Sequence, residues 1–173
     1  MSTRKVILTA LFVAIGIVLP QTIHAFGGPL LGATLLPMHL SVFIGAMLLG
    51  PVSGIIIAVL SVGVGFMFGM PPILIASYMI FELIVYAFVS GWLFYKLKVN
   101  VFLSYFIAKI SGMAVAILAL LIMMNLFLID FPPAFGTIAM FYPGVIGIVL
   151  QIFIIPSTVL ILRKELKKHE RLS

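Results

Sequence analysis

Residues 73–100 read ILIASYMIFELIVYAFVSGWLFYKLKVN, and this stretch decides the fold. From Ile73 to Tyr95 it contains a single charged side chain, Glu82, and the basic turn from Lys96 to Asn100 follows. A helix needs about 20 apolar residues to cross the hydrocarbon core of a bilayer. The stretch therefore predicts a membrane-spanning helix over residues 73–95 that ends at one membrane surface.

The composition of the whole chain points the same way. The chain has 173 residues, of which 64% are hydrophobic and 8% are charged, and its mean hydropathy is +1.39. A soluble domain has roughly a quarter of its residues charged, so a water-soluble fold is excluded. The chain contains no cysteine, which excludes disulfides, thiolate metal sites and thiol nucleophiles.

Glycine, proline and polar residues divide the chain into six apolar segments. We predict an all-α, polytopic membrane protein, a single domain over residues 1–173, with six transmembrane helices. The predicted helices cover about residues 6–23, 36–49, 52–68, 73–95, 101–128 and 144–162. Loops are expected from His24 to Pro29 and from Asp130 to Pro143, and the short turn at Lys96 makes the fourth and fifth helices antiparallel neighbours.

Positive charge sets the orientation, because short loops rich in lysine and arginine stay in the cytoplasm. Basic residues gather at positions 4–5, 96–98 and 163–171. An even number of spans puts these three groups on one side of the membrane, whereas an odd number moves one of them outside. Both termini are therefore predicted to be cytoplasmic. The loop from Asp130 to Pro143 is then an outer loop, and its three prolines favour a lid.

Ionisable side chains within the bilayer mark functional candidates, because each costs about 2.5–3.5 kcal/mol on insertion scales. Three lie in the predicted spans, at His39, Glu82 and Lys109. Glu82 lies ~13 Å from the outer end of its helix, close to the midplane. Four-residue spacing puts Tyr78, Glu82 and Tyr86 on one helical face. Such a face suits a small ring compound, which the aromatic rings can stack on while the carboxylate accepts its hydrogen bonds.

Each polar candidate also has a purely structural interpretation. Glu82 can pair with Lys109 of the neighbouring helix, because a lysine side chain can span most of the ~6 Å offset between them. His39, Asn125 and Gln151 can bind ligand or can hydrogen-bond between helices. The sequence leaves these alternatives open.

No catalytic constellation is recognisable in the sequence. It has no acid pair, no serine nucleophile elbow and no phosphate-cradling loop, so we expect no enzyme activity and no ATPase of its own. His24, His39 and Glu82 lack the spacing of a metal site, and no metal or cofactor is expected. The basic residues flank membrane segments and form no stripe, which argues against a nucleic-acid partner.

Ala10 and Ala14 lie four residues apart on the first predicted helix. Small residues at this spacing let a second helix approach closely. The pair therefore indicates either docking of another membrane protein or packing within the bundle.

The chain resembles the substrate-binding S components of energy-coupling factor (ECF) vitamin transporters. The resemblance covers the first four predicted helices, and the last two add length and topology. The stretches that carry it are Leu8 to Ala14, Leu36 to Leu40, Gly45 to Gly54, Phe68 to Pro72 and Phe81 to Leu83.

This resemblance implies a multi-pass protein of a prokaryotic plasma membrane that binds a vitamin or vitamin precursor in an outward-facing pocket closed by outer loops. It implies docking through the alanines of the first helix, here Ala10 and Ala14, onto a transmembrane T component that carries two ATPases. It also implies a toppling motion that turns the pocket inward. Glu82 occupies a fourth-helix position like those from which relatives contact substrate.

Polarity narrows the expected ligand. Glu82 is the sole acid deep in the predicted helices, and no permanent cation lies in their outer half, so a neutral or cationic ring compound is favoured. Pyridoxine or hydroxymethylpyrimidine fits this description, and pantothenate is the alternative if His39 is charged or Lys109 reaches the pocket. An alternative function is that of an autonomous proton-coupled carrier, in which Glu82 and Lys109 act as a protonation switch.

Overall fold

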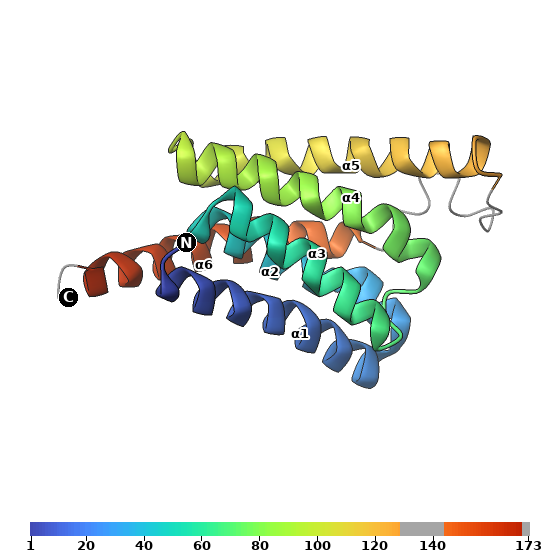
Figure 1. Cartoon of the computed structure of the whole chain (residues 1–173), viewed down its shortest axis with the longest axis horizontal. Coiled ribbons are helices and arrows are strands. Elements are labelled where there is room, and N and C mark those ends of the chain that lie inside the picture. Colours follow the sequence, from blue (N-terminus) through green and yellow to red (C-terminus); the bar gives the residue numbers. More distant parts are fainter. Residues whose placement is uncertain (129–143, 171–173) are drawn as a thin grey trace.

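The structure is a computed structural model that describes residues 1–128 and 144–170. Within these ranges the chain forms helices and no strands, which confirms the predicted all-α, polytopic fold (Figure 1). The elements are α1 (Thr3–Leu35), α2 (Pro37–Leu49), α3 (Pro51–Met67), α4 (Ile73–Ser90), the π-helical segment η1 (Gly91–Lys96), α5 (Val101–Asn125) and α6 (Val145–Glu170). The predicted lid from Asp130 to Pro143 lies outside the described residues.

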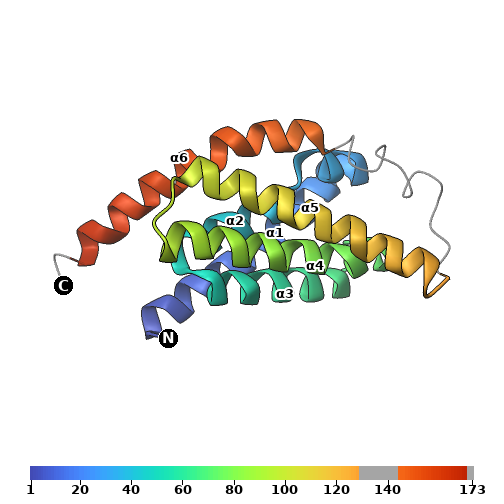
Figure 2. The same ribbon diagram turned by 90° about the horizontal axis from the view of Figure 1, so that it is seen from above.

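Five helical stretches of the described chain are long and apolar enough to cross a membrane. They are Thr3–Gly28, Leu30–Leu49, Ile73–Lys96, Val101–Asn125 and Val145–Leu166. The apolar helix α3 has 17 residues, at the lower limit of a spanning helix. Both termini and the turn between α4 and α5 lie at one end of the bundle, as an even number of crossings requires (Figure 2).

The predicted loop from His24 to Pro29 is wrong, because α1 continues through it to Leu35. Its single non-helical residue is Gly28, at φ 69° and ψ 179°. Glycine adopts this positive φ without a Cβ penalty, and proline is well suited to the first position of the helical stretch that follows. The Gly-Gly-Pro sequence therefore makes a break between two helical stretches, and no loop forms.

Helix α2 is the centre of the bundle. Of its 13 residues, 11 are buried, and it packs against α1, α3, α4 and α6. Pro37 begins the helix, where no amide hydrogen is needed, and Gly50 ends it at a positive φ of 92°. Gly54 of α3 faces Ala46 of α2 and Ala87 of α4, so the missing side chain lets the three helices approach closely.

Helices α4 and α5 lie side by side as antiparallel neighbours, as the short turn between them predicted (Figure 2). The chain continues from α4 into η1 up to Lys96, and α5 begins where the Asn100 side chain accepts a hydrogen bond from the Phe102 amide at 2.8 Å. α5 ends at Asn125, three residues before the predicted end. α6 extends eight residues beyond the predicted Leu162, because its charged end can stay helical in water outside the bilayer.

Candidate functional site

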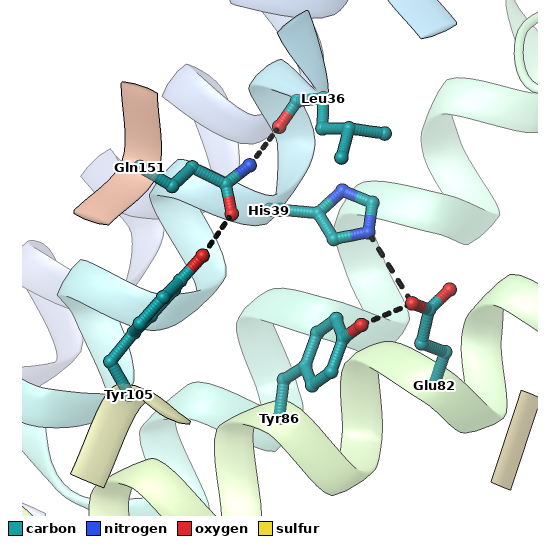
Figure 3. A network of polar contacts seen from close by, with 6 residues as sticks. All are labelled: Leu36, His39, Glu82, Tyr86, Tyr105 and Gln151. Carbon is teal, nitrogen blue, oxygen red and sulfur yellow. Dashed lines mark hydrogen bonds and ion pairs between the residues drawn. The ribbon is translucent and has the colours of Figure 1, made fainter. Parts of the chain in front are cut away.

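A cluster of polar side chains, Glu82, Tyr86 and His39, is buried between α2 and α4 (Figure 3); we call it the Glu82 cluster. The Tyr86 hydroxyl donates a hydrogen bond to Glu82 Oε1, and His39 Nε2 lies 3.9 Å from the same oxygen. Glu82 is 6% exposed and His39 4%. Buried charges in proteins are usually paired or hydrogen-bonded, and this carboxylate has both kinds of contact.

Local structure explains why these three side chains meet. Tyr86 lies one helical turn after Glu82, so both project from the same face of α4. His39 lies in the first turn of α2, where its amide donates to the Leu36 carbonyl at 3.1 Å. Leu36 has left-handed backbone angles, φ 50° and ψ 51°, and this turn directs α2 toward α4. The prediction from sequence did not indicate that His39 and Glu82 would be neighbours.

Lys109 joins this cluster through the Tyr86 ring. Its Nζ lies 4.6 Å from the ring centroid, a cation–π contact, and the side chain is buried. Among the described residues, the ion pair of Glu82 within 4.0 Å is with His39, so the direct Glu82–Lys109 pair does not form.

A second polar cluster, formed by Tyr105, Gln151 and the Leu36 carbonyl, links α5, α6 and the start of α2 (Figure 3). The Tyr105 hydroxyl lies 3.3 Å from Gln151 Oε1 and donates to it. Gln151 Nε2 donates in turn to the Leu36 carbonyl at 3.4 Å. Phe43 connects the two clusters, because its ring centroid lies 4.8 Å from that of Tyr86 and 5.0 Å from that of Tyr105.

Tyr105 was missed in the sequence, although a signal was present. It precedes Lys109 by four residues, so the two side chains share one face of α5. Applying to the fifth helix the spacing argument made for the fourth would have identified it. Both residues face the core, and Tyr105 is fully buried.

Two other predicted residues differ in their placement. Tyr78 is buried on the Glu82 face of α4, one turn nearer the beginning of that helix. Asn125 is exposed at the end of α5, and its Nδ2 donates to the Leu121 carbonyl at 2.8 Å. The structure thus brings Glu82, Tyr86 and His39 together, keeps Tyr78 on the same face of α4, places Gln151 in the adjoining cluster and leaves Asn125 on the surface.

The Glu82 cluster retains unused hydrogen-bonding capacity. His39 Nδ1 is buried and has no hydrogen-bond partner among the described residues. An ionised carboxylate can accept about four hydrogen bonds, and Glu82 receives one from Tyr86. Because buried polar atoms are almost always satisfied, His39 Nδ1 lacks a partner that such an atom usually has, and the Glu82 carboxylate can accept further hydrogen bonds. A ligand with donor and acceptor groups on a flat ring could supply it and stack against Phe43 or Tyr86.

In the part of the chain that is described, no three His, Cys, Asp or Glu side chains gather as metal ligands would.

Ala10 and Ala14 lie away from both polar clusters, on the solvent- or lipid-exposed face of α1. Both are exposed, and their surroundings on this helix include the exposed side chains of Ile7, Leu11 and Val18.

The Tyr86 ring packs closely against α5 at Gly112, where the absence of a side chain leaves room for it. A Cβ at Gly112 of α5 would meet the Tyr86 ring and would lie 3.0 Å from the Glu82 carbonyl oxygen. We therefore expect Gly112→Ala to destabilise the protein by roughly 1–3 kcal/mol, as overpacking of a core does. Thermal unfolding in detergent measures this. Gly63→Ala of α3 is the control, because its Cβ meets nothing within 4 Å and should be neutral or stabilising. Equal stability of both variants would contradict the close packing.

One comparison with known proteins gives a match that covers most of the chain. A family model described as the substrate-specific component of the ECF transporter matches residues 4–162. No curated protein and no solved structure matches the chain. The matched range includes both polar clusters and the alanines of α1.

Proposed function

The chain belongs to the substrate-specific components of ECF transporters, and from this premise we propose that it captures a small water-soluble vitamin or vitamin precursor from outside the cell. Membership makes the protein a multi-pass membrane subunit of a transporter rather than an enzyme. It also implies association with the ECF transmembrane T subunit and the ATPase subunits. The energy for uptake then comes from those partners.

The observation that carries the proposed binding site is the buried carboxylate of Glu82 with its incomplete set of partners. Burying a charged group in an apolar bundle is costly, and an apolar residue at this position would avoid the cost. His39 Nε2, at 3.9 Å, is too far for a good hydrogen bond to Glu82 Oε1. An amine, ammonium or hydroxyl group of a ligand would donate the hydrogen bonds that the carboxylate lacks.

The surroundings of Glu82 favour a neutral or cationic ring compound of the pyridoxine or hydroxymethylpyrimidine type. Phe43 and Tyr86 offer aromatic surface, and Glu82 supplies the acceptor. Pantothenate is the alternative ligand, because its carboxylate would pair with Lys109 or with a charged His39. In either case the ligand must enter between side chains that are now in contact. The site residues proposed are Glu82, Tyr78, Tyr86, His39, Gln151 and, nearer the surface, Asn125.

Transport into vesicles tests this function against an autonomous proton-coupled carrier. Vesicles that contain this chain with the T and ATPase subunits and internal ATP are expected to accumulate labelled pyridoxine or hydroxymethylpyrimidine. Vesicles with the chain alone and an imposed proton gradient are expected to accumulate neither. Uptake by the chain alone would overturn the proposal and would favour the carrier with Glu82 and Lys109 as its protonation switch.

A further inference from the structure

A pocket of about 330 Å³ opens at the end of the bundle where the termini and the α4–α5 turn lie, beyond the end of α4 and away from Glu82. Four of the residues that line it are basic, namely Arg4, Lys5, Lys98 and Arg163. Among the described residues, no acidic side chain lines it. The rest of the wall is largely apolar and comes from α1, α2, η1 and α6.

Aromatic rings hold three of these cations in place. Lys5 Nζ lies 5.2 Å and Lys98 Nζ 5.1 Å from the centroid of the same Tyr95 ring, and the Arg163 guanidinium lies 4.9 Å from the Phe94 ring. A cation–π contact positions a cation without neutralising it. Cations gathered in one pocket repel each other, and an anion bound among them would relieve that repulsion.

The position and the mixed wall of the pocket indicate which anion would fit. By the distribution of positive charge, this end of the bundle faces the cytoplasm, at the level where the phosphates of the inner leaflet lie. The apolar part of the wall, which includes Leu8, Leu49 and Leu166, suits the glycerol and upper acyl chain of a lipid. Basic pockets between transmembrane helices on this side bind anionic headgroups, and arginine matches phosphate geometry well.

We propose that this pocket binds the phosphate headgroup of an acidic phospholipid from the inner leaflet, with Lys5, Lys98 and Arg163 as its cationic ligands. The bound lipid would join the start of α1 to the turn after η1 and to the cytoplasmic part of α6. These three segments are distant in sequence and meet at this pocket.

The test measures phosphatidylglycerol binding to the delipidated full-length protein in detergent by native mass spectrometry. The site variant combines Lys98→Gln with Arg163→Gln. The control variant combines Lys96→Gln with Lys164→Gln, which removes the same charge from adjacent exposed residues that do not line the pocket. We expect the site variant to bind phosphatidylglycerol about tenfold to thirtyfold more weakly than the control variant.

Further arms of the experiment separate the possible sources of phosphate. Phosphatidylcholine should bind weakly and equally to both variants, and inorganic phosphate should compete with phosphatidylglycerol only at high concentration. Equal loss of phosphatidylglycerol binding in the two variants would overturn the pocket. Saturation by inorganic phosphate without phosphatidylglycerol binding would overturn the lipid as its occupant. A thermal unfolding curve for each variant ensures that folded proteins are compared.

Discussion

Replacing Glu82 with glutamine is expected to weaken binding of a pyridoxine-type ligand by about tenfold to a hundredfold. The amide keeps the size of the side chain, and its oxygen can still accept a hydrogen bond from the Tyr86 hydroxyl. The negative charge that strengthens hydrogen bonds from the ligand is lost. Hydrogen bonds to charged groups contribute about 1.5–3 kcal/mol, which corresponds to this range of affinity. Isothermal titration calorimetry of the purified protein in detergent measures the change.

A control on the same helix makes this result interpretable. Ser90 is also a fully buried polar residue of α4, two turns beyond Glu82, and Ser90→Ala should leave the affinity unchanged. Thermal unfolding of Glu82→Gln shows whether the variant is folded. A folded Glu82→Gln protein with full affinity would remove Glu82 from the binding site and leave it the structural role of ordering His39 and Tyr86.

Substituting tryptophan for Ala10 or Ala14 is expected to reduce co-purification of the T and ATPase subunits by at least about tenfold. Both alanines are exposed on α1, so their small side chains contribute little to the packing of this bundle. A large indole at either position would hold a partner helix away, because close helix packing in membranes depends on small residues. Affinity purification of the tagged chain, followed by quantification of the partner subunits, measures the effect.

The matched control for helix docking is Ala114→Trp. Ala114 is likewise an exposed alanine in the interior of a membrane-spanning helix, but it lies on α5. This variant should recover the partner subunits as the wild-type protein does. Equal recovery with all three variants would exclude the Ala10 and Ala14 face as the docking surface. Ligand binding should be unchanged in each of them, because the alanines lie away from the Glu82 cluster.

Membrane spans were predictable because the bilayer imposes a simple rule on composition. A long apolar stretch must form a helix, since every backbone polar group must be satisfied within lipid. Charge placement also indicated that both termini and the Lys96 turn share one end of the bundle (Figure 1). The junction at Gly28 was not predictable in this way, because Gly-Gly-Pro is compatible with both a loop and a break between two helices.

The candidate site was predictable within a helix but not between helices. Regular spacing placed Tyr78 and Tyr86 with Glu82, since one turn of helix fixes that relation. The approach of His39 to Glu82 depends on how α2 packs against α4, which no local pattern encodes. For the same reason, the sequence suggested Lys109 as an ion-pair partner of Glu82, but in the structure Lys109 contacts the Tyr86 ring. Asn125 projects outward because of where α5 ends, a boundary that sequence locates only to a few residues.

Mass spectrometry of bound small molecules tests the central claim most directly. The wild-type protein and Glu82→Gln are each incubated with an equal mixture of pyridoxine, hydroxymethylpyrimidine and pantothenate, separated from free ligand and denatured. The account predicts that the wild-type protein releases about one equivalent of a ring compound of the first two kinds and that Glu82→Gln releases far less. Release of none of the three compounds by the wild-type protein, or of equal amounts by both proteins, would contradict it.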